Sequence, residues 1–314
     1  MKAVLQYRAS AGFRQSLARM CPSWLEVSVV NDANPDSLAR AIRDAEVLLH
    51  VLEPVTAAVI AAAPRLRLIQ KIGVGVNTID LAAAAARGIA VANMPGINSQ
   101  AVAEFTLGLM LALLRHIPLL DRRTRGGEGW STDPETFDRA GEIQGRVVGF
   151  MGFGQVPRRL APVIEALGGS VIHANRTLIE CGGHRQVPFE ELLAQSDILS
   201  LHVPLAPDTV RIIDARALAR MKRGAMLINT ARGELIDEGA LYMALRSGQL
   251  AGAALDVLAT EPAPAGHPLF TLSNVLVTPH IAWQTPETLR RSLEVAIRNC
   301  QNIRAGSPLL NRIV

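Results

Sequence analysis

The chain is poor in cysteine. Its three cysteines, Cys21, Cys181 and Cys300, lie far apart among 314 residues. Their spacing matches neither a zinc site nor a redox dithiol, and a disulfide framework needs a denser set. We therefore expect no metal site and three unpaired thiols in a reducing compartment, which favours a cytoplasmic protein.

Aromatic residues and charge of one sign are also scarce. Only 4% of the residues are Phe, Trp or Tyr, which leaves little material for stacking single-stranded bases. Lys and Arg number 32 against 28 Asp and Glu, and the densest basic run, residues 122–125, is short and followed by two glycines. Despite a net charge of +4, we expect no nucleic-acid partner.

Long hydrophobic runs are missing as well. The longest, residues 105–114, is bounded by Glu104 and Arg115 and falls well short of the roughly 20 apolar residues of a membrane span. A buried helix and no membrane partner are expected instead. What the chain does contain is 49% hydrophobic residues, enough for a large core and, at 314 residues, about two domains.

Short apolar stretches alternate with Ala- and Leu-rich stretches, which is typical of parallel sheets with crossover helices. We therefore predict an α/β fold. In the first part, strands are expected over residues 3–7, 26–30, 47–52, 68–72 and 90–92, and helices over 35–44, capped by Asn34, and 80–87. In the second part, strands are expected over residues 147–151, 170–174, 198–201, 225–229, 253–257 and 275–278.

The second set of strands begins in mid-chain, so an earlier domain must precede it. A long helix predicted over residues 286–303 has apolar residues at helical spacing and must pack on another element. We expect it to return to the first domain. The predicted division is a discontinuous substrate-binding domain over 1–97 and 285–314 and a cofactor-binding domain over 98–284, each built on a doubly wound parallel sheet.

A glycine-rich loop follows the strand predicted over residues 147–151. It reads Gly152-Phe153-Gly154-Gln155-Val156-Pro157, and a helix over residues 155–167 comes next. In a dinucleotide-binding loop the first glycine permits a tight turn, and the second lets backbone approach the pyrophosphate at the helix N-terminus. Pro157 replaces the usual third glycine, and Pro is tolerated in a first helical turn. A plain strand-turn-helix is the alternative.

The end of the next strand bears on which dinucleotide binds. It reads Asn175-Arg176-Thr177, without the Asp or Glu that an NAD-selective site places on the ribose 2'-hydroxyl. Arg can neutralise a 2'-phosphate, and small polar groups can hydrogen-bond to it. We therefore predict NADP as the cofactor, with NADPH preferred over NADH. A polar turn that does not discriminate is the alternative.

Three residues suit the reduction of a keto acid, which needs a cation for the carboxylate, an acid for the oxygen and a group that holds the acid charged. Arg232 and His280 each follow a predicted strand end, where ligands bind in open α/β sheets. Glu261 lies between them, and a carboxylate near an imidazole would raise its pKa and orient it. Singly, each residue has an ordinary alternative: a surface Arg, a turn Glu and a hydrogen-bonded structural His.

Several stretches together resemble the D-isomer-specific 2-hydroxyacid dehydrogenase family over nearly the whole chain. They are residues 73–80, 93–104, the Gly152 loop, 202–205, 229–233, 253–257, 261–262 and 278–283. The resemblance implies a Rossmann-type cofactor domain and a flavodoxin-like substrate domain. It also implies that Arg232 binds the substrate, that His280 is the acid/base and that Glu261 supports His280.

The resemblance implies further contacts. The backbone amides of Val74 and Gly75 would bind the substrate carboxylate, although a plain strand-end turn is the alternative there. Asp256 would hold the nicotinamide carboxamide. The predicted cofactor contacts are Gly152, Gly154, Gln155, Val156, Asn175, Arg176, Thr177, His202, Val203, Pro204, Thr209, Thr230, Asp256 and His280.

Two residues bear on the substrate. Trp283 resembles the glycerate dehydrogenase and hydroxypyruvate reductase branch, where a bulky aromatic limits the pocket; a core or dimer-contact Trp is the alternative. Glu53 either faces the predicted cleft or lies on the surface. The leading hypothesis is NADPH-dependent reduction of glyoxylate, hydroxypyruvate or a similar small 2-keto acid.

Two other functions stay open. One is a dehydrogenase of a larger 2-hydroxy acid, or one that works in the oxidative direction, and the other is a non-catalytic, corepressor-like NAD(P) sensor. Residues 104–115, followed by 121–142, resemble the hinge helix and the arm through which the family dimerises. A homodimer is therefore expected.

Overall fold

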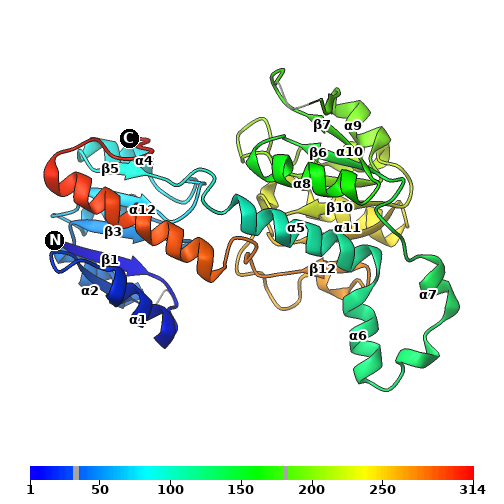
Figure 1. Ribbon diagram of the computed structural model, residues 1–314, viewed down its shortest axis with the longest axis horizontal. Helices are drawn as coiled ribbons and strands as arrows, with labels where there is room; N and C mark the ends of the chain where they lie inside the picture. Colours follow the sequence, from blue (N-terminus) through cyan, green and yellow to red (C-terminus); the bar gives the residue numbers. More distant parts are fainter. Residues whose placement is uncertain (31–34, 180–182) are drawn as a thin grey trace. The chain divides into compact units, whose positions relative to one another are not determined.

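The computed structural model describes residues 1–30, 35–179 and 183–314 (Figure 1). Asn34 and Cys181, for which we expected a helix cap and a free thiol, lie outside these ranges. The chain divides into two compact units, Met1–Asn98 with Gln284–Val314, and Ser99–Trp283. Each unit contains one parallel sheet with helices on it, so the predicted α/β fold is confirmed.

The first unit is built on a five-stranded parallel sheet in the order β2-β1-β3-β4-β5. Its strands are β1 (Lys2–Gln6), β2 (Glu26–Val30), β3 (Val47–His50), β4 (Leu68–Lys71) and β5 (Ala90–Ala92). This is the flavodoxin-like order. Strands β1, β3 and β4 are buried almost throughout, which explains their continuous apolar runs.

Helices cover the faces of this sheet. They are α1 (Ala11–Met20), α2 (Pro35–Ala41), α3 (Ala57–Ala61), α4 (Leu81–Ala86) and α12 (Pro286–Ala305), with a 3₁₀ turn η1 (Ile42–Asp44). The helix expected over residues 35–44 is therefore α-helical only as far as Ala41. In α4, the Asp80 side chain caps the first turn by accepting the Ala83 amide at 2.9 Å.

The long helix α12 packs on the first unit. The buried side chain of Asn299 donates to Gln70 Oε1 at 2.6 Å on β4 and to the Leu310 carbonyl at 3.0 Å. The helix runs to Ala305, further than the predicted residue 303, because Gly306 is the residue that adopts the left-handed C-cap conformation, with φ 68°. The sequence after residue 283 thus completes the fold that residues 1–98 begin.

The second unit carries a seven-stranded parallel sheet in the order β12-β11-β10-β9-β6-β7-β8. Its strands are β6 (Val147–Met151), β7 (Ser170–Ala174), β8 (Arg185–Gln186), β9 (Ile198–Leu201), β10 (Ala225–Asn229), β11 (Leu250–Leu255) and β12 (Val275–Val277). From β8 to β11 this is the Rossmann order, extended by β12 at one edge. The predicted Rossmann-type sheet is confirmed, although β11 begins and ends earlier than the expected residues 253–257.

The helices of the second unit are α5 (Ser99–Leu114), α6 (Ile117–Arg125), α7 (Pro134–Asp138), α8 (Gln155–Ala166), α9 (Phe189–Gln195), α10 (Ala215–Arg220) and α11 (Glu238–Arg246), with 3₁₀ turns η2 (Gly129–Ser131), η3 (Gly233–Leu235) and η4 (Pro268–Thr271). Helix α5 packs against α8 and β11. Its Met110 and Leu114 join Phe150 and Leu160 in one apolar cluster.

Helix α5 is long and rich in apolar residues. Within the described ranges, no single helix meets the length and hydropathy of a membrane span. Helices α5 and α6, bent by 63°, meet them only as a pair. Because nine residues of α5 are buried, its apolar character follows from packing in the core.

Candidate active site

The glycine loop between β6 and α8 is shaped to approach an anion. Gly152 has φ 85°, and a Cβ there would lie 2.7 Å from the His202 carbonyl oxygen. A Cβ on Gly154 would meet nothing within 4 Å, and Gly154 caps α8 without a side-chain hydrogen bond. Open space therefore adjoins the N-terminus of α8, and a helix N-terminus with room beside it can receive a pyrophosphate. The residues present fit a dinucleotide.

Pro157 does not prevent this arrangement. It is the third residue of α8, where its missing N–H costs no hydrogen bond, and it is buried. The helix starts at Gln155 in the ordinary way. The departure from the usual third glycine thus changes local packing and leaves the strand-loop-helix unit intact.

Residues 175–177, at the end of β7, are predicted to select the cofactor, and two of their side chains make different contacts. Asn175 Oδ1 accepts the Phe153 amide at 2.7 Å, so this side chain holds the glycine loop against the end of β7. The exposed guanidinium of Arg176 lies 3.3 Å from the carboxylate of Asp208. Arg176 is thus a cation at the surface, whereas Asn175 has a loop-holding function that the sequence did not reveal.

Other predicted cofactor contacts have structural partners. His202 Nε2 lies 2.9 Å from Ser200 Oγ, and burial lowers the pKa of His202 to about 3, so its ring is neutral. Thr209 Oγ1 donates to the Pro204 carbonyl at 2.9 Å and shapes the loop after β9. Thr230 Oγ1 lies 3.1 Å from Thr106 Oγ1 and ties the end of β10 to α5.

Arg232 lies in a tight turn after β10. The Asn229 side chain donates to the Arg232 carbonyl at 2.7 Å and accepts the Ala231 amide at 3.0 Å, which fixes this turn. Burial lowers the pKa of the Arg232 guanidinium, and the carboxylates of Glu234 and Glu261 partly oppose that effect. The guanidinium remains a cation and is held in a low-polarity setting, where its attraction for an anion is strengthened.

Glu261 and His280 are brought together. His280 Nδ1 donates to Glu261 Oε2 at 2.7 Å, and the Leu258 amide donates to Glu261 Oε1 at 3.0 Å. Burial alone would raise the pKa of Glu261, but the hydrogen bond and charge of His280, the Leu258 amide and Arg232 together lower it. With Nδ1 engaged, Nε2 is the ring nitrogen that can exchange a proton with a substrate.

Asp256 organises the loop that carries His280. Its buried carboxylate accepts the Thr278 hydroxyl at 2.6 Å and the amides of Ile281 and Ala282 at 3.0 and 2.8 Å. Its carbonyl accepts the His280 amide at 2.8 Å, and His280 has φ 55°. Burial raises the pKa of Asp256. These hydrogen bonds and the charge of His280 lower it, but burial has the larger effect. The predicted carboxamide-binding residue is therefore also the anchor of the acid/base candidate.

The remaining site candidates lie at two places. Val74 and Gly75 belong to the first unit, in a turn where Gly73 has φ 143° and the Val74 carbonyl accepts Asn93 Nδ2 at 2.8 Å. Lys71, which sequence reasoning missed, is buried in front of this turn and donates to the Val51 carbonyl. Trp283 ends the second unit and is 9% exposed, and Glu53 is exposed.

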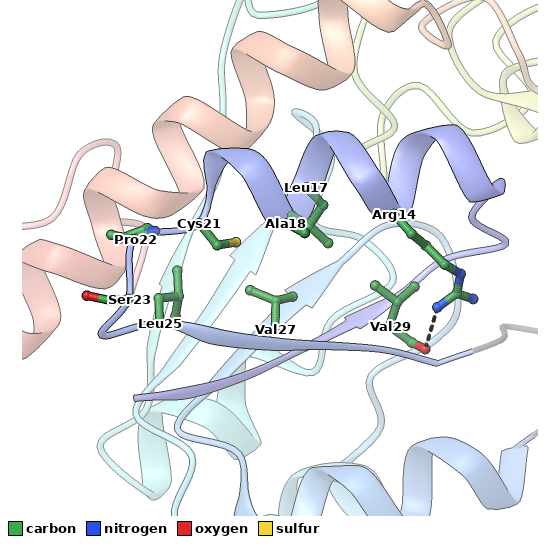
Figure 2. Close-up of a pocket in the computed structure, with 9 residues that line it drawn as sticks. All are labelled: Arg14, Leu17, Ala18, Cys21, Pro22, Ser23, Leu25, Val27 and Val29. Carbon is green, nitrogen blue, oxygen red and sulfur yellow. Dashed lines mark hydrogen bonds between the residues drawn. The ribbon is translucent and has the colours of Figure 1, made fainter.

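A groove of about 390 Å³ lies elsewhere, between α1 and β2 (Figure 2). Apolar side chains line it, and Arg14 Nη1 closes one end by donating to the Val29 carbonyl at 3.3 Å. The thiol of Cys21 faces it, and burial raises the pKa of that thiol, which makes Cys21 a poor nucleophile. The groove contains none of the predicted site residues. Among the described residues, no group of three His, Cys, Asp or Glu side chains is placed to hold a metal ion.

Comparison with known proteins agrees with this geometry. The model of the D-isomer specific 2-hydroxyacid dehydrogenase NAD-binding domain matches residues 107–282. The glyoxylate reductase of Korarchaeum cryptofilum is 36% identical over 290 residues, 90% of this chain and 87% of that protein. The chain belongs to the D-isomer specific 2-hydroxyacid dehydrogenase family. As a member of this family it is an NAD(P)-dependent oxidoreductase.

Two further relatives show the breadth of this dehydrogenase family. The NADPH-dependent glyoxylate/hydroxypyruvate reductase of Sinorhizobium meliloti, solved with NADP and malonate, has a TM-score of 0.84 at 27% identity and covers 100% of this chain and 96% of that one. The D-3-phosphoglycerate dehydrogenase of Archaeoglobus fulgidus is 36% identical over 304 residues, 95% of this chain but only 57% of that protein.

The open space at Gly154 leads to a prediction for this dehydrogenase. Gly154→Ala places a methyl group in the open space where we predict that the pyrophosphate binds, so the Kd for NADPH and for NADH should both rise by about tenfold. Because that methyl group meets no protein atom, the free energy of unfolding should stay within about 0.5 kcal/mol of wild type. Isothermal titration and chemical denaturation measure the two quantities.

Gly152→Ala is the matched control for Gly154→Ala. Its methyl group meets the His202 carbonyl oxygen in a left-handed backbone conformation, so it should cost about 1 kcal/mol or more of folding stability. If Gly154→Ala bound both dinucleotides as tightly as wild type, the pyrophosphate would not lie at this helix end.

Proposed function

We propose that this dehydrogenase reduces a small 2-keto acid, of the glyoxylate or hydroxypyruvate type, to the D-2-hydroxy acid. The observation that carries the proposal is the 2.7 Å contact of Glu261 with His280. The His280 loop follows β12, and the turn of the partly buried Arg232 follows β10. Glyoxylate reductases among the curated relatives support it, and so does the glyoxylate/hydroxypyruvate reductase among the solved structures.

Each residue has a defined task in this reaction. The nicotinamide supplies the hydride when it is bound. Arg232 holds the substrate carboxylate and polarises the carbonyl oxygen, and His280 donates a proton to that oxygen from Nε2. Glu261 keeps the Nδ1 proton in place and stabilises the positive charge of the imidazolium. After transfer, His280 is neutral and takes a new proton from solvent.

The proposal extends to the two domains. Residues 1–97 and 285–314 would bind the substrate through the amides of Val74 and Gly75, and residues 98–284 would bind the cofactor. The exposed Val74 turn supports this, because paired glycines let backbone N–H groups approach an anion. Trp283 would limit the size of the substrate at the end of the second unit.

Dehydrogenation of a larger 2-hydroxy acid is the second candidate function. D-3-phosphoglycerate dehydrogenases are as similar to this chain as the glyoxylate reductases are, at 36–38% identity. The chain spans only about half to three-fifths of their length, 54% and 57% in two cases. A substrate panel separates the two functions, and absence of turnover with every compound would favour a nicotinamide sensor.

The acid/base assignment predicts the behaviour of two variants. His280→Ala should lower kcat for glyoxylate or hydroxypyruvate about 10²- to 10⁴-fold, because it removes the proton donor, and should change the Kd for NADPH far less. Reduction needs the protonated imidazole, so kcat/KM should fall as pH rises. In Glu261→Gln this fall should occur at lower pH, because the carboxylate that favours the imidazolium is gone.

The measurement is NADPH oxidation with glyoxylate, hydroxypyruvate, pyruvate and phenylpyruvate across a pH series. Near-normal kcat in His280→Ala would rule out His280 as the acid. Higher kcat/KM for phenylpyruvate than for glyoxylate and hydroxypyruvate would replace the small-substrate proposal with the larger one.

We also propose NADPH as the preferred cofactor, on the strength of the exposed Arg176 guanidinium and the absence of a carboxylate at the end of β7. Arg176→Ala should raise the Kd for NADPH about tenfold and leave that for NADH unchanged, because only NADPH has the 2'-phosphate. Asp208→Asn is the matched variant: it releases Arg176 from its ion pair, so it should tighten NADPH binding. Tighter binding of NADH than of NADPH by wild type would contradict the proposal.

A homodimer and a cytoplasmic location complete the proposal. The segment from α6 to α7 exposes Ile117, Trp130 and Phe137, and Trp130 is 91% exposed. Apolar side chains of this kind are typical of a surface that another chain covers. A monomeric mass by light scattering would contradict the dimer. Cys21 and Cys300 are free thiols, as expected in a reducing compartment.

A further inference from the structure

Glu238, the first residue of α11, makes two hydrogen bonds away from its own helix. Its Oε1 accepts the Ala259 amide at 2.8 Å, and its Oε2 lies 3.2 Å from His267 Nε2. Because a carboxylate oxygen only accepts, His267 donates from Nε2. The Glu238 side chain is 22% exposed, so both bonds form in a partly buried setting.

Ala259 belongs to the loop that carries Glu261. This loop runs from the end of β11, at Leu255, to the start of η4, at Pro268, without a helix or strand of its own. Two consecutive amides of the loop are bonded to carboxylates: Leu258 to Glu261 itself and Ala259 to Glu238. Of these two carboxylates, Glu261 belongs to the loop itself, whereas Glu238 lies on helix α11.

The same segment of the loop lies against the turn that carries Arg232. A Cβ on Gly233 would lie 2.0 Å from the Leu258 carbonyl carbon and 2.3 Å from the Ala259 nitrogen. The backbones at 233 and at 258–259 are therefore in direct contact. The Ala259 segment is held by the Gly233 backbone and by the Glu238 carboxylate together.

We propose that Glu238 is a positioning residue: it fixes the 258–259 segment so that Glu261 meets His280. The proposal rests on the proposed function, since it concerns the same acid/base pair. The bond from Ala259 is charge-assisted, which makes it about twice as strong as a neutral amide hydrogen bond. Without this bond, the 258–259 segment is held less firmly beside Gly233, and the Glu261 carboxylate moves relative to the imidazole.

His267 holds Glu238 in this orientation. Its ring packs beside Phe270, with centroids 5.2 Å apart, and its Nδ1 is buried without a hydrogen-bond partner in the described part of the chain. An unpaired buried nitrogen costs free energy, and the charge-assisted hydrogen bond from Nε2 to Glu238 offsets that cost. His267 thus orients the Glu238 carboxylate, Glu238 holds the Ala259 amide, and the position of Ala259 determines where Glu261 lies.

The test compares three variants at position 238. Glu238→Ala removes the acceptor, and kcat for the keto acid should fall about 10- to 100-fold, because misplacement by about 1 Å has such an effect. The fall of kcat/KM with rising pH should move to lower pH, as in Glu261→Gln, although Glu261 is intact. The Kd for NADPH should not change. Glu238→Gln keeps an acceptor for the Ala259 amide and should recover most of the lost kcat.

Glu238→Asp is the third variant and covers the case in which Glu238→Ala does not fold. It keeps the charge but is one methylene shorter, so it should reproduce the shift of the pH profile in part. A wild-type kcat and pH profile in Glu238→Ala or Glu238→Asp would overturn the proposal. So would a loss in Glu238→Gln as large as that in Glu238→Ala. Loss of turnover in His280→Ala but not in Glu238→Ala would leave the proposed function standing and remove only this inference.

Discussion

The hydrogen bonds of the Asp256 carboxylate are the interaction on which the candidate site depends. One buried side chain accepts the Thr278 hydroxyl and the amides of Ile281 and Ala282, while its own carbonyl accepts the His280 amide. These bonds hold a histidine in a left-handed backbone conformation that non-glycine residues rarely adopt. Burial of an isolated carboxylate is costly, and here the hydrogen bonds offset that cost.

Strand order explains why these groups gather. Strands β10, β11 and β12 are adjacent and parallel, with Asn229 opposite Leu255 and Leu255 opposite Val277. The residues that follow them therefore leave the sheet at the same edge, which brings the Arg232 turn, Asp256 and the His280 loop together. Glu261 reaches this edge from the loop after β11, and the contacts of Glu238 and Gly233 with that loop determine its course.

Neighbouring strand ends, those of β6 and β7, also shape the predicted cofactor site. The Gly152 amide donates to the Ala174 carbonyl at 2.8 Å and the Phe153 amide to Asn175 Oδ1, so the end of β7 fixes the shape of the glycine loop. One short stretch, residues 175–177, thus serves both the loop and the surface near the predicted ribose. This leaves Arg176, with Asp208 beside it, as the charged group that distinguishes the two dinucleotides in our proposal.

The sequence by itself determined the α/β class, the two sheets and most strand positions, because alternating apolar stretches, glycine turns and helix caps act over a few residues. It also placed Arg232 and His280 just after strands, which made them candidates. Only the tertiary structure decided that Asn175 holds the glycine loop, that Asp256 anchors His280, and that Glu238 and buried Lys71 stand beside the predicted site residues. These contacts join residues 20 to 26 positions apart, and local pattern carries no information about such pairs.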